Sequence, residues 1–120
     1  ANRMDADIVI SLHLDHVESP KPNGISVYYF GSPSGGNHSP GGRILAGFIN
    51  EELISRTDRK DCRIHPRTWD LLRFTRMPTV RIELGYMSNA GDAKRLTSEA
   101  FHDAVAEGVV AALTRFCSPR

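Results

Sequence analysis

The sequence predicts a single α/β domain whose mostly parallel sheet is flanked by helices. A near-continuous apolar run at 8–12 is typical of a strand covered on both faces, as in a parallel sheet. Two further strand patterns, at 25–30 and 79–86, are separated by an amphipathic helical pattern, and a second one closes the chain. With 120 residues and 40% hydrophobic content, the chain is long enough for one core and too short for two.

The first strand is expected to carry a polar face and an apolar face. If the strand is regular, Ser11, His13 and Asp15 share one face, opposite Ile10 and Leu12. The polar face is therefore available for chemistry while the other face packs.

The second strand lies between two loops. The stretch 16–24 is a loop by its proline, asparagine and glycine content. The glycine- and serine-rich stretch 31–42 is interpreted as a mobile surface loop, because too little chain follows it for a second core. Apolar side chains alternate along the strand itself, at Ile25, Val27 and Tyr29.

The central part of the chain predicts one helix and one strand. The helix is expected to begin near Gly42, and its apolar face comprises Ile44, Leu45, Phe48, Ile49 and Leu53. The stretch 55–68 is polar and irregular, so no element is predicted there. Pro78 precedes the third strand, in which Val80, Ile82 and Leu84 share one face.

The last third of the chain predicts two helices. Asn89 is suited to cap a short helix, and Ser98 is suited to begin a long one. The long helix carries a single apolar stripe made of Phe101, Val105, Gly108, Val109, Ala112, Leu113 and Phe116. The predicted order of the main elements is therefore β, β, α, β, α.

Composition narrows the classes of partner. The 15 basic and 14 acidic residues leave a net charge of +1, which gives no electrostatic case for nucleic acid or an anionic membrane. No apolar run is long enough to span a membrane. Cys62 and Cys117 lack metal-ligand spacing, and a disulfide between them stays open. The opening segment, 1–7, resembles the end of a helix and suggests a cut within a larger protein.

Two residues that can do chemistry stand where strands leave the predicted sheet, His13 and Glu83. A neutral imidazole is a good metal ligand, and a carboxylate is a good general base. A histidine on an apolar strand is more often a satisfied core residue than a ligand, but the position of His13 at the strand end, with Asp15 on the same face, favours the ligand role. Asp15 itself could ligate a metal, orient His13 or begin a turn. Glu83 could instead form an ion pair with Arg81 or Arg73. One histidine alone is too few to hold a catalytic metal.

The remaining polar and aromatic candidates are interpreted as structural. No phosphate-binding loop and no nucleophile-elbow motif is present. The residues in question are the histidines His16, His38, His65 and His102 and the aromatics Tyr28, Tyr29, Phe30 and Trp69, for which core and rim positions are favoured over a sugar-stacking platform.

Taken together, ADIVISLHLD, GISVYYF, LLRFTRMPTVRIELGYMSN and the closing helix resemble the zinc-dependent N-acetylmuramoyl-L-alanine amidases. The resemblance extends from Ala1 to about Phe116, and VRIELGYMSN is its most specific segment. It implies an α/β sheet of mostly parallel strands and cleavage of the amide between N-acetylmuramic acid and the first L-alanine of the peptidoglycan stem. It also implies that His13 is the last of three zinc ligands and that Glu83 is the catalytic carboxylate.

The resemblance is incomplete on the N-terminal side. The family's first two ligands, a histidine in a Gly-His-Gly-Gly segment and a glutamate, would lie before Ala1, and His38 follows the wrong strand to replace one of them. Residues 1–120 are therefore expected to form the C-terminal part of a single amidase domain, with zinc bound weakly or not at all by this chain alone. The sheet would be incomplete at its N-terminal side, and the missing part of the same domain would be a partner of this one.

Three functions follow from this pattern. The first is a peptidoglycan or muropeptide hydrolase acting in the periplasm or the extracellular cell wall. The second is a catalytically inactive amidase-like domain, compatible with the cytoplasm, that regulates cell-wall synthesis by binding a precursor or a partner protein. The third and least favoured is a metal-free glycan-binding module, which leaves Glu83 in an apolar strand unexplained.

Overall fold

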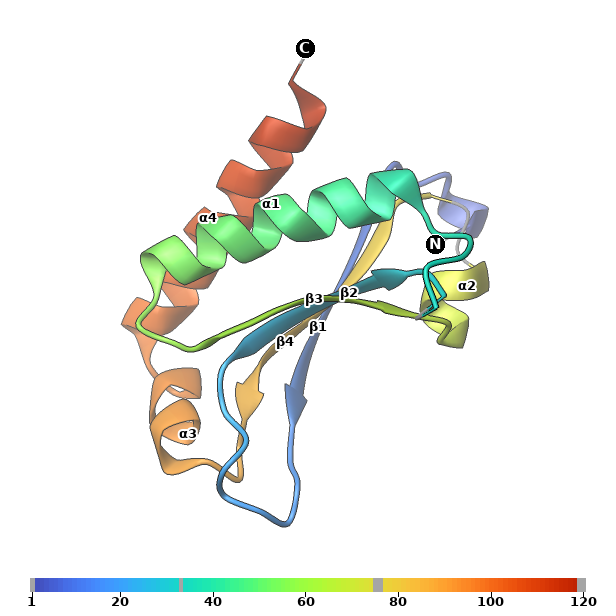
Figure 1. Cartoon of the computed structure of the whole chain (residues 1–120). Coiled ribbons are helices and arrows are strands. Elements are labelled where there is room, and N and C mark those ends of the chain that lie inside the picture. The colour runs from blue at the N-terminus through green and yellow to red at the C-terminus, as the bar shows by residue number, and fades with distance from the viewer. Residues whose placement is uncertain (1, 33, 75–76, 119–120) are drawn as a thin grey trace.

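The computed structural model describes residues 2–32, 34–74 and 77–118 (Figure 1). Within these residues, four strands and four α-helices follow a short 3-10 helix. In chain order the elements are η1 (Asn2–Met4), β1 (Val9–Asp15), β2 (Ile25–Phe30), α1 (Pro40–Arg56), β3 (Asp61–Arg67), α2 (Asp70–Phe74), β4 (Thr79–Tyr86), α3 (Ala90–Leu96) and α4 (Glu99–Cys117).

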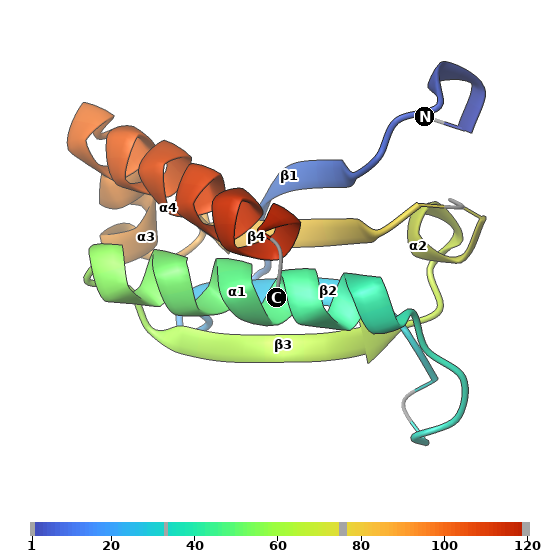
Figure 2. The ribbon, with the colours of Figure 1, turned by 90° about the horizontal axis from the view of Figure 1, so that it is seen from above.

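The four strands form one open, mixed sheet in the order β1-β4-β2-β3. The β1–β4 and β2–β3 pairs are parallel, and the central β4–β2 pair is antiparallel. The two long helices, α1 and α4, lie side by side over the same face of the sheet (Figure 2). The predicted α/β class, with a mostly parallel sheet flanked by helices, is confirmed.

The core lies between the sheet and the two long helices. Its sheet side comes from Ile25, Val27, Tyr29, Val80 and Ile82, and its helix side from Leu45, Ala46, Ile49, Leu53, Phe101, Val105 and Ala112. These are the apolar faces that the alternation of β2 and β4 and the stripe of α4 predicted. The predicted caps are also present, since Asn89 accepts from Asp92 N and Ser98 accepts from Phe101 N.

Three predictions need correction. They concern the stretch 55–68, the start of the first long helix and one residue of its apolar face. The stretch predicted to be irregular contains β3, which pairs with β2 and packs Ile64 against the core. Arg63 has a φ of +69°, which breaks the alternation of side chains along β3. The polar sequence of β3 therefore shows no strand pattern. Helix α1 begins at Pro40 rather than near Gly42, behind the cap Ser39. Ile44, assigned to its apolar face, is 39% exposed.

The first strand, predicted to be covered on both faces, is the edge of the sheet. Leu12 is 56% exposed and Leu14 is 54% exposed. Together with Ile10 they form one wall of an apolar groove of about 600 Å³ whose other wall is α4. Val9 N donates to Pro78 O, so the backbone groups of Ile10, Leu12 and Leu14 point away from β4 and find no strand partner within the described residues.

The two cysteines and the helices can be compared with what the composition led us to expect about a disulfide and a membrane span. Cys62 and Cys117 are free thiols, and Cys62 donates to Asn23 O at 3.1 Å. Burial raises the pKa of the Cys62 thiol. In the parts of the chain that the structure describes, every helix is too short or too polar to cross a bilayer.

Candidate functional site

The site lies on the face of the sheet opposite α1 and α4. Because Ile10 and Leu12 face the groove beside α4, their strand neighbours Ser11 and His13 point to the other face. Along β4, Val80 and Ile82 enter the core, so Glu83 shares that second face with His13. His13 and Glu83 are direct register partners of the parallel β1–β4 pair. The sequence predicted each residue at a strand end, and the structure makes them neighbours.

Glu83 is a buried carboxylate with one oxygen engaged and one free. Only 4% of the residue is exposed. Arg81 Nε donates to its Oε1 at 2.9 Å, and Arg81 Nη2 lies 2.8 Å from the same oxygen, so the ion pair weighed from the sequence is present. Its Oε2 is buried and has no hydrogen-bond partner among the described residues. A buried acceptor left without a partner is uncommon in folded proteins, and a catalytic role is one explanation for it.

His13 is half-buried at the end of β1. Its Nε2 lies 2.6 Å from the hydroxyl of Ser11, two residues earlier on the same face. Asp15 Oδ1 accepts from the neighbouring His16 N at 2.8 Å, and the three roles considered for Asp15 stay open. Among the described residues, no three histidine, cysteine, aspartate or glutamate side chains come together as a metal site. This chain therefore presents one imidazole beside one free carboxylate oxygen.

The turn that follows Glu83 is fixed by Asp92, which is 1% exposed. Its Oδ2 accepts from Gly24 N and from Tyr86 N, both at 2.9 Å. Arg59 Nε lies 3.0 Å from its Oδ1, as an ion pair without the alignment of a hydrogen bond. Asp92 therefore ties the entry of β2 to the exit of β4. Sequence reasoning missed Asp92, because its position in the first turn of α3 is a common one for an acidic residue and does not indicate a special role.

Gly85 in the sequence LGY is required by this arrangement. Its φ of +155° is one that residues with a side chain rarely adopt. A Cβ at this position would lie 3.1 Å from the carboxylate of Asp92. The following residue, Tyr86, pairs with Asp15 across the sheet. Burial raises the pKa of Tyr86, so its phenol is a neutral hydroxyl at neutral pH.

An aromatic and cationic cluster adjoins Glu83 on the same face. Tyr28 is the register partner of Arg81, and its ring centroid lies 4.9 Å from that of Trp69. The guanidinium of Arg81 lies 5.0 Å from the Trp69 centroid. The guanidinium of Arg67 lies 5.2 Å from Tyr28 and 5.8 Å from Trp69. The rim position predicted for Trp69 agrees with its 39% exposure, but its two guanidinium neighbours were not foreseen.

The other histidines have structural surroundings. His65 Nε2 lies 2.6 Å from Cys62 O, and His102 Nε2 lies 2.6 Å from Leu96 O. His38 is exposed in the loop after β2 and meets Tyr29 edge-on, with ring centroids 6.5 Å apart. None of these contacts involves Glu83 or His13.

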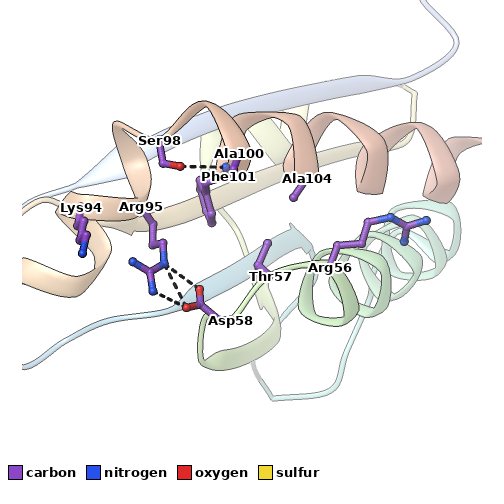
Figure 3. A pocket seen from close by; sticks show the side chains of 9 residues that line it. All are labelled: Arg56, Thr57, Asp58, Lys94, Arg95, Ser98, Ala100, Phe101 and Ala104. Atoms are coloured by element: carbon purple, nitrogen blue, oxygen red, sulfur yellow. Dashed lines mark hydrogen bonds and ion pairs between the residues drawn. The ribbon is translucent and has the colours of Figure 1, made fainter.

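A second, more polar hollow lies on the helix side of the sheet and is separate from this site. It has a volume of about 420 Å³ and lies between the end of α1 and the α3–α4 junction (Figure 3). Arg95 reaches across its mouth and donates to both carboxylate oxygens of Asp58. Ser98 is occupied as the cap of α4. Of the polar side chains shown there, Arg95 and Asp58 are paired with each other, and none forms a hydrogen bond or ion pair with Glu83 or His13.

The fold and the site define an α/β domain that presents a free carboxylate oxygen where two parallel strands end, the usual place for a ligand in open α/β sheets. The profile of the N-acetylmuramoyl-L-alanine amidases matches residues 1–115. The chain belongs to this family.

Individual relatives agree with this assignment. N-acetylmuramoyl-L-alanine amidase CwlM of Mycobacterium tuberculosis is 48% identical over 115 residues, which are 96% of this chain and 28% of that protein. N-acetylmuramoyl-L-alanine amidase LytC of Bacillus subtilis is 26% identical over 104 residues, which are 87% of this chain and 20% of that protein. The chain thus spans less than a third of these relatives.

Solved amidase structures share the fold. The catalytic domain of CwlV, an amidase of Bacillus (Paenibacillus) polymyxa, matches with a TM-score of 0.80 at 28% identity and covers 95% of this chain and 59% of that one. The CwlD amidase of Clostridioides difficile, solved in complex with the GerS lipoprotein, matches with a TM-score of 0.84 at 26% identity, covering 96% and 56%. Each of these two domains therefore extends well beyond the part matched here.

Proposed function

We propose that this chain is part of a peptidoglycan hydrolase that cleaves the amide between N-acetylmuramic acid and L-alanine. The observation that carries the proposal is the buried, unpartnered Oε2 of Glu83, held beside His13 in a family of amidases. The ion pair with Arg81 uses Oε1 alone and leaves Oε2 available to a substrate or a water molecule.

Zinc is the metal that the family implies, and the residues present fit one side of a zinc site. His13 would supply one ligand, and the orphaned Oε2 of Glu83 would face the reacting water. Catalytic zinc sites normally have three protein ligands, so two further ligands must come from outside the described residues. When bound, zinc polarises the scissile carbonyl and increases the acidity of water.

Glu83 then provides the proton transfers. Its Oε2 accepts a proton from the water that attacks the carbonyl carbon, and Glu83 returns the proton to the nitrogen of L-alanine as the C–N bond breaks. Arg81 holds Oε1 through one hydrogen bond and an ion pair, so the free oxygen keeps one orientation toward the substrate side.

The decisive experiment replaces Glu83 with glutamine in the full-length protein. The isosteric amide cannot act as a base, so muropeptide cleavage should fall by roughly 10²- to 10⁴-fold while zinc content stays unchanged. Glu107, exposed on α4, gives the matched control, and Glu107→Gln should keep full activity. Retained cleavage by Glu83→Gln would contradict the catalytic assignment.

A second candidate is a catalytically inactive amidase-like domain that regulates cell-wall synthesis by binding a precursor or a partner protein. The incomplete ligand set favours it, and CwlD shows that an amidase of this fold can form a complex with another protein. Zinc analysis of the full-length protein discriminates between the two candidates. Stoichiometric zinc with hydrolysis supports the enzyme, which would act in the periplasm or the cell wall. Absence of both supports a regulator, which could be cytoplasmic.

A further inference from the structure

The aromatic and cationic cluster beside Glu83 has an unbalanced charge. Arg67 and Arg81 both approach the indole of Trp69, so two positive charges converge on one side chain. Glu83 lies within ion-pair distance of Arg81. Within the described residues, no carboxylate lies within ion-pair distance of Arg67, whose one hydrogen bond goes from Nη1 to the carbonyl of Pro66 at 2.8 Å. Two like charges brought together in this way favour the binding of an anion.

The geometry also prepares Arg67 for a particular kind of anion. Its guanidinium lies against the rings of Tyr28 and Trp69, which restrain the side chain without using its N–H donors. The remaining donors form the planar fork that matches a carboxylate with two parallel hydrogen bonds. The cluster therefore has the character of a preorganised carboxylate receptor.

The register of β2 and β4 gives the distance of Tyr28, the ring against which the Arg67 guanidinium lies, from the proposed reaction centre. Ser26 is the partner of Glu83, and Tyr28 is the partner of Arg81, two residues along the strands. Two residues of strand correspond to roughly 7 Å. An extended peptide covers that distance in about two residues.

From these observations we infer that Arg67, held on the Tyr28 and Trp69 rings, binds a free carboxylate of the peptide part of the substrate, about two residues from the cleaved amide. This inference rests on the proposed function for the identity of the peptide. It adds that recognition of the peptide is by charge, at a position separate from the reacting atoms.

The test measures binding rather than turnover. The full-length protein is titrated with L-alanyl-glycine and, separately, with its C-terminal carboxamide, while the indole N–H resonance of Trp69 is followed by NMR. The carboxylate form should bind roughly tenfold more tightly, which is the usual effect of one hydrogen bond between charged groups. Arg67→Gln should remove this preference, and Arg67→Lys should retain part of it. Arg43→Gln, which removes an exposed arginine on α1, should leave the preference intact.

Each outcome supports or contradicts either the Arg67 receptor or the proposed enzymatic function. Equal binding of the two peptides, or an unchanged preference in Arg67→Gln, overturns the inference. Arg67→Lys guards against loss of folding in Arg67→Gln, because it keeps the aliphatic stem and the charge. Carboxylate preference in a protein that does not hydrolyse muropeptides would support the receptor and contradict the proposed enzyme. Hydrolysis without any carboxylate preference would do the reverse.

Discussion

The carboxylate of Glu83 is held in place through one oxygen, while its other oxygen remains available to accept a proton. Arg81 binds a single oxygen of the carboxylate, and the other oxygen stays buried without a partner. Such an arrangement is unfavourable for stability, because a buried polar atom without a hydrogen bond costs about 1–3 kcal/mol. It is favourable for a base, because the free oxygen needs no reorganisation before it accepts a proton.

Asp92 gives the first stability prediction. Asp92→Ala should lower the free energy of unfolding by about 2–4 kcal/mol, because it leaves two backbone N–H groups and Arg59 without their buried acceptor. Urea denaturation of the full-length protein measures the change. Asp92→Asn is the matched control. It keeps one side-chain oxygen for the amides of Gly24 and Tyr86, so its loss should be smaller. Equal stabilities for the native and alanine proteins would contradict the role assigned to Asp92.

The packing of the two long helices depends on Gly108. A Cβ at this position of α4 would lie 2.8 Å from Cδ2 of Leu53 on α1, so a side chain there forces the helices apart. Gly108→Val should therefore destabilise the protein by about 1–3 kcal/mol through overpacking.

Gly47 provides the contrasting position. It also lies in a long helix, but a Cβ there meets nothing within 4 Å. Gly47→Ala should therefore stabilise the protein by about 0.4–1 kcal/mol, since alanine restricts the unfolded chain. Thermal unfolding of the two variants, measured side by side, separates a packing effect from a general effect of replacing helical glycine. Tolerance of Gly108→Val would show that α1 and α4 are not closely packed there.

At the element level, sequence patterns predicted what depends on local periodicity. The alternation of β2 and β4 and the stripe of α4 are reproduced, because each buries one face against the same core. Strand β3 was missed, since its pairing with β2 and not its polar sequence makes it a strand. The exposure of Leu12 and Leu14 was missed for a related reason. Periodicity cannot tell whether a strand lies at the edge or in the centre of a sheet.

The same distinction holds for the candidate site. Arg81 and Glu83 share a face of β4 because they are two residues apart, so the sequence indicated their pairing. The meeting of Arg67 with Trp69 could not be predicted, because it requires β3 and the segment before α2 to converge over Tyr28. Contacts between residues far apart in sequence depend on strand order, which local patterns do not contain.

For the whole molecule, the described residues leave an open surface at the edge of β1 with its apolar groove. Exposed leucines and unpaired backbone groups together are typical of a sheet edge that another segment covers. We propose that the N-terminal part of the same amidase domain covers it, since the matched amidase structures extend well beyond the part shared with this chain.

Amide exchange tests this proposal. In the full-length protein, the outward amides of Ile10, Leu12 and Leu14 should exchange with solvent as slowly as those of Ser11 and His13, which bond to β4. Residue-resolved NMR exchange measures both sets in one sample, so the inward amides serve as the internal control. Fast exchange confined to the outward set would show that no segment pairs with this edge.

The register of β1 with β4 also has a consequence for biosynthesis. His13 and Glu83 are separated by most of the chain, yet they are direct partners across the sheet. A polypeptide is synthesised from its N-terminus. Pairing of residues so far apart requires a long loop to close, at a cost in conformational entropy, before the contacts between them stabilise the fold. The two residues therefore remain apart while β2, α1 and β3 are being synthesised. Any wall-degrading activity of this domain is absent from the nascent protein until β4 has left the ribosome.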